Sequence, residues 1–258
     1  MKRTIIGTRN SLMLGLLTLA MICVVCGCKN KPTQKVDDSN IVVGIDVSEY
    51  QGQIEWDKLA IAKEVVDSCI AEVDKAALTE TLPVKFVFIR ATKSNHYVDK
   101  FFLQNFDAVR QQGICRGAYH FLTDTVSGKL QAENYINTVV LEEGDLPPVL
   151  DIEVLSPKTA ETAKEWLSIV EANYGRQAIV YTNCNVYDNI IANDSLLNTR
   201  DLWLAQWSPN RPENTNCRFW QMSAKCKMNS ISANVVDVNL FLGNSTEFKR
   251  YVERAGQK

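Results

Sequence analysis

The chain has 258 residues, of which 46% are hydrophobic and 22% are charged. This balance is typical of one large globular domain and argues against a disordered or fibrous protein. The formal net charge of -2 offers no basic surface, so a nucleic-acid partner is not expected.

The first 27 residues have the pattern of a bacterial lipoprotein signal. A basic start, Met1–Arg9, precedes an apolar run from Leu12 to Val25 that is short for a membrane span. The small residue Gly27 then stands before Cys28, as expected at a site of cleavage and lipidation. We expect a lipid on Cys28. The alternatives are an ordinary secretory signal or an uncleaved anchor, and both place the domain outside the cytoplasm.

Removal of the signal changes the charge and the cysteine content. It takes away three positive charges and no acids, which moves the net charge from -2 to -5. With Cys28 lipidated, an odd number of cysteines remains, which permits at most two disulfides. Cys217 and Cys226, nine residues apart, are the best candidates for a bridge that closes a hairpin, although spacing alone leaves the pairing open. The remaining cysteines are Cys69, Cys115, Cys184, Cys217 and Cys226.

A polar stretch and then a folded domain follow the signal. Residues 28–40 contain Pro32 and no apolar periodicity, and they predict a flexible tether. The domain then occupies residues 41–258. The cysteine spacings match no zinc pattern and the chain has only two histidines, so neither a metal nor another cofactor is expected.

From Ile41 onward, short β-branched runs alternate with helical patterns, as in βα units around a parallel sheet. Asp99–Gln112 and Thr159–Tyr174 have apolar residues at helical spacing. The pattern predicts an α/β fold, a single-domain modified (β/α) TIM-like barrel, made irregular by final strands that suit antiparallel pairing. The eight predicted strands are Ile41–Asp46, Lys85–Ala91, Gly117–Phe121, Pro148–Glu153, Ala178–Asn183, Leu202–Trp207, Arg218–Met222 and Val235–Phe241.

Two acids end one of these strands. In a barrel of this kind the active site lies at the carboxyl ends of the strands. The apolar run from Leu146 ends in Asp151 and Glu153, and period-two alternation places both side chains on one face. Two close carboxylates raise the proton affinity of one of them, which is what a general acid for a glycosidic oxygen needs. The alternative is structural: Asp151 caps the next helix or pairs with Arg90, and Glu153 is simply solvated.

Further polar residues fall near the same end of the predicted barrel. Asp46 and Asp237 lie in the first and last strands, which are neighbours in a closed barrel, so we expect them at the same mouth. Acids around a cleft with aromatic walls are typical of sugar hydrolases. Tyr119, Tyr181 and Trp207 are the candidate walls, and a place in the core is the alternative for each.

Two other polar residues are assigned structural roles. No serine or cysteine in a nucleophile motif accompanies His120, which we interpret as a hydrogen-bonded barrel histidine. Cys184 lacks a distinct partner residue, and we interpret it as a structural cysteine.

An ordered set of segments from about Ile41 to Gly243 resembles the muramidases of glycoside hydrolase family 25. The resemblance implies a modified β/α barrel, and cleavage of the β-1,4 bond between N-acetylmuramic acid and N-acetylglucosamine in peptidoglycan. The segments are Gly44-Ile-Asp46-Val-Ser48-Glu-Tyr-Gln51, Phe86-Val-Phe-Ile-Arg90-Ala-Thr92, Gly117-Ala-Tyr119-His120-Phe121, Asp151-Ile-Glu153, Tyr181-Thr182-Asn183, Leu202-Trp-Leu-Ala-Gln206-Trp207, Trp220-Gln221 and Val236-Asp237-Val-Asn239.

The resemblance also implies roles for individual residues. Glu153 matches the general acid, and Asp151 matches a partner that orients a water or the substrate's own 2-acetamido group. Asp46 and Asp237 match the remaining cleft acids. Direct inversion and an acetamido-assisted route both stay open; a wide gap between carboxylates leaves room for water and a narrow one favours a covalent route. Substrate contacts are expected from Tyr119, Tyr181, Gln206, Trp207 and Arg90.

The sequence departs from the family pattern in two places. Where the family often has Ala-Thr-Glu-Gly, this chain has Ala-Thr-Lys93-Ser94, so a base replaces an acid and a flexible glycine is lost near the mouth. The segment from Trp56 to Pro83 is longer than usual. Its apolar residues at four-residue spacing, Val65, Cys69 and Val73, suggest an extended helix.

Three functions remain open at this point. The leading one is a muramidase that acts as a monomer on peptidoglycan glycan strands and is held to a membrane through Cys28. The Lys93-Ser94 change motivates the second, a glycan-binding lipoprotein without turnover. The third is a hydrolase of another amino-sugar polymer, such as chitin.

Overall fold

A computed structural model describes residues 41–62, 81–208, 210–214 and 216–255. The chain divides into two units at Gln34, and all described residues belong to the second unit. The predicted signal, Cys28, the tether and the helix predicted around Cys69 lie outside the described residues. Within the described part, no helix has both the length and the apolar character needed to cross a membrane.

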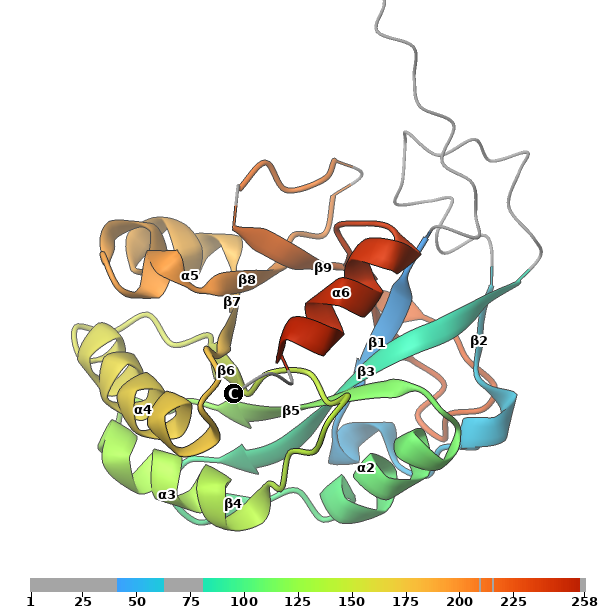
Figure 1. Ribbon diagram of the computed structural model, residues 1–258, viewed down its shortest axis with the longest axis horizontal. Helices are drawn as coiled ribbons and strands as arrows, with labels where there is room; N and C mark the ends of the chain where they lie inside the picture. The colour runs from blue at the N-terminus through green and yellow to red at the C-terminus, as the bar shows by residue number, and fades with distance from the viewer. Residues whose placement is uncertain (1–40, 63–80, 209, 215, 256–258) are drawn as a thin grey trace, which may run out of the picture. The chain divides into compact units, whose positions relative to one another are not determined.

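Eight strands close into a barrel. Figure 1 shows strands of this barrel together with the helices around them. The order around it is β1-β10-β9-β8-β7-β6-β5-β3, and parallel pairing of β1 with β3 closes the ring. Only β10 runs antiparallel to both of its neighbours. The predicted irregular single-domain α/β barrel is confirmed. The strands are β1 (Val43–Val47), β3 (Thr81–Lys93), β5 (Cys115–Phe121), β6 (Val149–Ile152), β7 (Ile179–Asn183), β8 (Asp201–Ala205), β9 (Cys217–Cys226) and β10 (Val236–Phe241).

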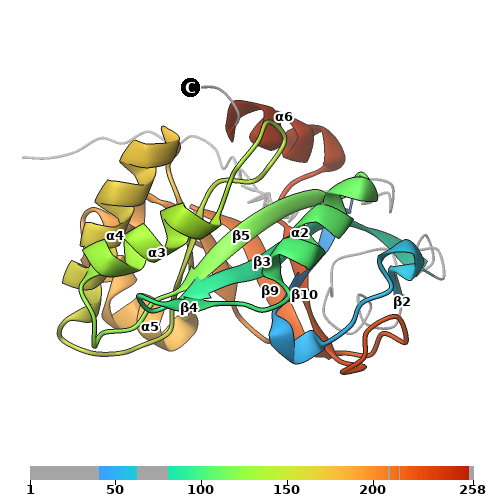
Figure 2. The same cartoon turned by 90° about the horizontal axis from the view of Figure 1, so that it is seen from below.

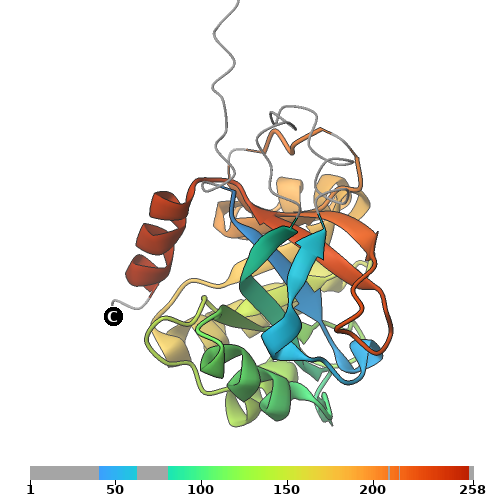
Figure 3. The same ribbon diagram turned by 90° about the vertical axis from the view of Figure 1, so that its right-hand side faces the viewer.

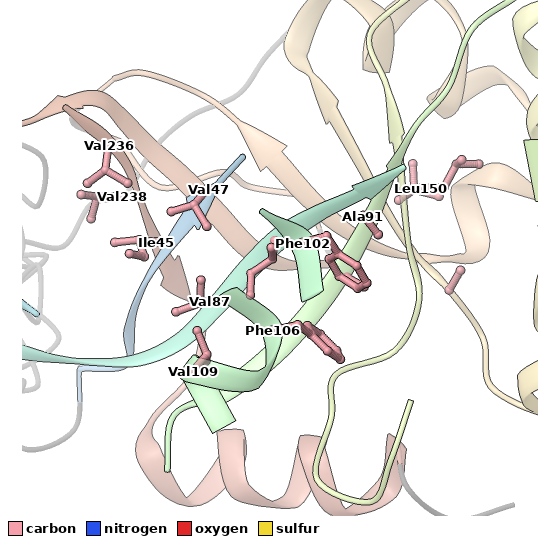
Figure 4. Close-up of a cluster of buried hydrophobic side chains, with 14 of the residues drawn as sticks. Ile45, Val47, Val87, Ala91, Phe102, Phe106, Val109, Leu150, Val236 and Val238 are labelled. Atoms are coloured by element: carbon pink, nitrogen blue, oxygen red, sulfur yellow. The ribbon is translucent and has the colours of Figure 1, made fainter. Parts of the chain in front are cut away.

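Helices cover the outer wall of the barrel. Alternation along each strand sends every second side chain outward, where it packs under a helix. Figure 4 shows Phe102, Phe106 and Val109 of one helix lying close to Val87 and Ala91 of β3. These helices are α2 (Phe102–Gln111), α3 (Gly128–Thr138), α4 (Thr159–Tyr174) and α5 (Cys184–Asn189), with short 3-10 turns η2 (Glu49–Gln51), η3 (Trp56–Lys58), η5 (Ile191–Asn193) and η6 (Leu197–Thr199).

The two predicted helices differ in how well their ends were placed. α4 has the predicted bounds, and it ends because Gly175 adopts the left-handed backbone (φ 65°) that glycine tolerates. α2 begins three residues later than predicted. The reason is that Asp99 is drawn into side-chain hydrogen bonds, with the backbone N–H of Phe101 (3.0 Å) and that of Glu49 (2.8 Å).

The inward-facing side chains change character from one end of the barrel to the other. Aromatic rings fill one end, which α6 (Ser245–Ala255) closes by packing Phe248 on Phe86 and Tyr251 on Phe219, with ring centroids 5.6 Å apart in both pairs. Figures 2 and 3 show α6 set apart from the other helices. Because the period is two, polar residues further along the same strands also face inward, at the opposite end. They include Asp46, Arg90, Asp151, Gln221, Asn239 and Asp237.

Two short strands lie off the ring and pair with β3. β2 (Ala60–Ala62) pairs antiparallel with its first residues, Thr81 to Pro83, and β4 (Tyr97–Val98) pairs with its last, Thr92 and Lys93. The long segment after Trp56 therefore begins and ends in paired strands. The predicted helix within it falls outside the described residues.

The disulfide predicted between Cys217 and Cys226 is wrong. The two residues are the first and last of one continuous strand, β9. Nine steps at about 3.3 Å per residue put their backbones roughly 30 Å apart, whereas a disulfide needs Cα atoms within about 7 Å. No hairpin turn occurs between them, because this stretch pairs with β8 on one side and β10 on the other.

Candidate active site

A cavity of about 200 Å³ opens at the carboxyl ends of the parallel strands. The four acids singled out from the sequence, Asp46, Asp151, Glu153 and Asp237, all line it. From the sequence, Asp237 was assumed to lie at the carboxyl end of its strand. β10 is instead antiparallel to its neighbours, so its first residues lie at this mouth. Asp237 is the register partner of Asp46 in the antiparallel pair. Arg90, Tyr119 and Tyr181, predicted to contact substrate, line the same cavity.

A larger cavity of about 550 Å³ lies between the starts of β1, β3 and β5 and helix α6. Its lining includes Val42, Cys115, Phe248 and Val252 together with charged side chains from the surrounding loops. The smaller cavity is the candidate active site, because it is lined by the four acids, which come from the ends of three strands, β1, β6 and β10. Among the described side chains, no group of three or more His, Cys, Asp or Glu is arranged to hold a metal ion.

Two amide side chains fix the orientation of Asp46. Asn239 Nδ2 donates to Asp46 Oδ2 at 2.8 Å, and the other end of that amide, Oδ1, accepts from Trp203 Nε1 at 2.7 Å. An indole N–H is only a donor, so it forces the Asn239 oxygen toward itself and the N–H toward the acid. Asp46 is therefore held as a hydrogen-bond acceptor.

Gln221 repeats this arrangement from the neighbouring strand. Its Nε2 donates to Asp46 Oδ2 at 3.0 Å, while its Oε1 accepts from Tyr181 OH at 3.1 Å and from Trp207 Nε1 at 3.2 Å. Gln221 is buried, and these contacts link the exposed Trp207 at the rim to the acid in the floor.

The pKa values of Asp46 and Asp237 are both raised. Burial raises the pKa of Asp46, while hydrogen bonds from Asn239, Gln221 and Asp237 oppose the rise. Burial and the negative charge of Asp46 raise the pKa of Asp237 to about 8. Asp237 is the proton carrier at neutral pH, because Asp46 already receives two N–H donors that stabilise its ionised form.

Asp151 is buried and has an unused oxygen. Its Oδ1 makes no hydrogen bond within the described part of the chain, which is costly for a buried carboxyl. Burial, followed by the negative charges of Glu153 and Asp46, raises its pKa well above the usual value, while Arg90 and Lys93 act in the opposite direction. A protonated or substrate-bonded Asp151 is the arrangement that this environment favours.

Glu153 lies one residue beyond β6, on the same face as Asp151 and more exposed to solvent. Partial desolvation of its carboxyl and the negative charge of Asp46 raise its pKa, and the Tyr181 hydroxyl and Lys93 oppose this. A carboxyl at the rim whose pKa is raised is suited to general-acid catalysis.

Arg90 is engaged by acids other than Asp151. Its guanidinium contacts Asp99 Oδ2 (2.9 Å) and Glu49 Oε1 (3.2 Å), and it lies under the ring of Tyr50 at 5.1 Å. The sequence alternative in which Asp151 pairs with Arg90 is therefore not the arrangement found. Arg90 lines the cavity but mainly braces the turn that carries Glu49 and Tyr50.

That turn, Ser48–Gln51, is built by its own sequence. Gln51 Oε1 accepts from the Ser48 backbone N–H at 2.8 Å, and Ser48 Oγ accepts from the Tyr50 N–H at 3.3 Å, which together cap the 3-10 turn η2. Tyr50 is 73% exposed on top of it. An aromatic ring held at the mouth in this way presents a face to a sugar.

The two residues after β8 differ in position. Gln206 braces its own loop, since its Nε2 donates to Asn210 O at 2.9 Å and its backbone oxygen accepts from Trp220 Nε1 at 2.7 Å. Trp207 is 67% exposed, and its Nε1 donates to Gln221 Oε1 at 3.2 Å. The Trp207 ring is thus exposed, whereas the Gln206 side chain is turned into its own loop.

His120 faces away from the cavity, into the layer between strands and helices. Its Nδ1 lies 2.7 Å from Thr92 Oγ1 and its Nε2 lies 3.2 Å from Gln131 Oε1, and its ring stacks on Trp166 at 5.6 Å. Burial lowers its pKa to about 4. His120 is the hydrogen-bonded barrel histidine that the sequence suggested.

Three contributors, Gln221, Asn239 and Tyr50, were not among the predicted site residues, although all three lie in the segments that resemble family 25. A signal existed for the first two, because each is a polar residue at period two from a large apolar one in its strand, Phe219 and Phe241. Tyr50 had no such signal, since its exposure depends on the turn that carries it.

Comparison with known proteins agrees with this geometry. Residues 45–231 match the glycosyl hydrolases family 25. Over 225 residues, 85% of this chain and 76% of the other, the sequence is 30% identical to the uncharacterized protein YegX of Escherichia coli strain K12. Over 227 residues, 81% of this chain and 70% of the other, it is 27% identical to Lysozyme M1 of Streptomyces globisporus.

Solved structures give the same result. A family 25 glycosyl hydrolase from Bacillus anthracis has a TM-score of 0.65 at 27% identity, covering 83% of this chain and 94% of that one. A bacterial lysozyme from Streptomyces coelicolor has a TM-score of 0.66 at 25% identity, covering 83% and 98%. By sequence and by fold, the chain belongs to glycosyl hydrolase family 25.

Proposed function

We propose that this protein is a muramidase that cleaves the β-1,4 bond between N-acetylmuramic acid and N-acetylglucosamine in peptidoglycan. The observation that carries the proposal is the convergence of Asp46, Asp151, Glu153 and Asp237 on one cavity at the mouth of a family 25 barrel. The two named lysozymes to which the chain is similar, from Streptomyces globisporus and Streptomyces coelicolor, support the choice of substrate.

The acids divide the chemistry between them. Glu153, with its raised pKa, donates a proton to the leaving glycosidic oxygen. The unused Oδ1 of Asp151 accepts a hydrogen bond from the group that attacks the anomeric carbon, either a water or the 2-acetamido group. The ionised Asp46, held by Asn239 and Gln221, stabilises the positive charge that develops on the sugar ring.

Exposed aromatic side chains bind the strand on either side of these acids. Trp207 and Tyr50 are both mostly exposed at the mouth, and pyranose rings stack on such faces through their C–H groups. Tyr119 and Tyr181 lie deeper and form the wall beside Asp151.

Glu153→Gln tests the catalytic assignment. Glutamine keeps the size of the side chain but has no proton to donate, so release of reducing ends from purified peptidoglycan should fall by about 10²- to 10⁴-fold with an unchanged unfolding temperature. Glu161→Gln, at an exposed glutamate on α4, is the matched control and should retain full activity. Full activity in the Glu153→Gln variant would contradict the proposal. So would a wild-type protein that binds glycan but does not cleave it.

A second proposal concerns attachment. We propose that the mature chain begins at Cys28 and is held by a lipid on that residue to a bacterial membrane, on its periplasmic or cell-surface side; the sequence around Cys28 supports this. Expression in a bacterial host followed by mass analysis should show a diacyl or triacyl addition, which Cys28→Ser abolishes. A mature protein of unmodified mass that starts elsewhere would refute it.

A further inference from the structure

Lys93 stands at the rim of the catalytic cavity, at the end of β3. It is exposed, and its Nζ lies 4.7 Å from the centre of the Phe121 ring, a distance typical of a cation–π contact. Phe121 lines the cavity and is the register partner of Lys93 in the β3–β5 pair. The lysine stem therefore lies along the wall of the site.

The backbone around Lys93 is fixed on both sides. Tyr97 of β4 pairs with Lys93, and the next residue, Ser94, takes a left-handed backbone (φ 53°) that turns the chain. Ser94 is held there, because its N–H donates to Phe121 O at 3.2 Å and its carbonyl accepts from Asn134 Nδ2 at 3.0 Å. Lys93 is thus presented from a fixed position and not from a loose loop.

Lys93 forms no ion pair with a carboxylate of the described residues. In residues 81–208 and the other described ranges, no carboxylate lies within 4.0 Å of its Nζ, whereas Arg90 on the same strand contacts Asp99 and Glu49. Lys93 is nevertheless close enough to lower the pKa of both Asp151 and Glu153. It is a cation beside the acids that is free to meet a charge from outside.

The cavity acids disfavour binding of a negatively charged substrate. Four carboxyl groups line a small cavity, and any that are ionised repel an anionic glycan. An unpaired lysine at the rim both offsets that repulsion and offers a direct partner.

We propose that Lys93 determines specificity by binding a carboxylate carried by the glycan strand beside the bond that is cut. The proposal rests on the muramidase function above and names its preferred substrate class: strands with a free carboxylate near the scissile bond. Two sources have this chemistry, the lactyl carboxylate of peptide-free muramic acid and the carboxylates of an attached stem peptide.

The test compares matched substrates. Peptide-free glycan oligomers with free lactyl carboxylates are assayed beside the same oligomers converted to neutral methyl amides. Lys93→Gln should lower the ratio of kcat/KM on the acidic oligomers to kcat/KM on the neutral ones about two- to fivefold, as for an exposed ion pair. High salt should remove the difference between wild type and variant.

A control isolates the position of the charge. Lys100 also lies over an aromatic ring, Phe101 at 5.2 Å, and is exposed, but the carboxylate that its Nζ contacts is that of Glu49, at 3.8 Å, and not one of the four cavity acids. Lys100→Gln should leave the ratio of the two rates at its wild-type value. Because any effect of Lys93 on the acids' protonation applies to both substrates, the ratio reports only recognition of the substrate's charge.

The outcomes are distinct. If wild type cuts both oligomers equally well and amide-blocked or free stem peptides make no difference either, the inference is wrong while the muramidase function stands. An equal loss on acidic and neutral substrates also refutes it. A loss confined to strands with stem peptides supports the inference with the stem as the source. Failure of wild type to cut any strand overturns the proposed function itself.

Discussion

Replacing Asp237 by asparagine should stabilise the protein in a pH-dependent way. Burial and Asp46 raise the pKa of Asp237 from 3.8 to about 8, so between these values the folded chain keeps a proton that the unfolded chain has lost. Wild-type stability therefore falls as the pH rises through this window. Asparagine carries no such proton, and its amide still donates to Asp46.

The size of the effect follows from the shift. At about 1.36 kcal/mol per pH unit, the cost at pH 7 is at most about 4 kcal/mol. Asp237 is partly exposed, and solvent screening reduces this to about 1–2 kcal/mol, or roughly 2–8 °C in Tm for a domain of this size.

Urea unfolding of wild type and Asp237→Asn from pH 4 to pH 9 measures this directly. The variant should be as stable as wild type near pH 4. Its advantage in unfolding free energy over wild type should grow steadily toward pH 8 and stay constant above it. Asp188→Asn, at an exposed aspartate, is the control and should show no such trend. Parallel plots of unfolding free energy against pH for wild type and Asp237→Asn would refute the raised pKa assigned to Asp237.

Three further changes probe separate parts of the site. Gln221→Ala removes a donor from Asp46 and the acceptor of Tyr181, so kcat should fall about 10- to 100-fold and unfolding should require about 1–3 kcal/mol less; kinetics together with urea unfolding checks both. Trp207→Ala should raise KM roughly two- to tenfold with kcat and Tm nearly unchanged, because the ring is 67% exposed. Burial holds the pKa of His120 at about 4 against an ordinary 6.5, so the unfolded chain binds the extra proton and stability drops as the pH falls between these values. His120→Gln should lose that part of the acid sensitivity and keep its activity at neutral pH. The same slope of unfolding free energy against pH in variant and wild type would contradict this.

The parts of the fold that depend on local pattern were predictable from the sequence. Strand positions follow from β-branched runs, and the bounds of α4 follow from its apolar spacing and Gly175. The grouping of Asp151 with Glu153 needed only the period of two. The disulfide prediction failed because it depended on the length of a strand. The spacing of Cys217 and Cys226 suits a hairpin as well as one long strand, and the pairing of β9 with β8 and β10 shows that it is one strand.

The polar contacts within the site were not predictable for a related reason. Gln221 and Asn239 meet Asp46 only because β9, β10 and β1 become neighbours, and β10 is reversed between the other two. Arg90 illustrates the same limit. Its position at a strand end was evident, but its partners Glu49 and Asp99 come from turns whose paths are set by tertiary contacts.

The bond that is cut tests the central claim most directly. Purified peptidoglycan is digested with wild-type protein, the products are reduced with borohydride, and the new reducing ends are identified by mass analysis. The acid arrangement around Glu153 and the family 25 barrel predict reduced N-acetylmuramic acid at those ends, and its loss in Glu153→Gln. New reducing ends that carry N-acetylglucosamine, or no new ends at all, would contradict the account.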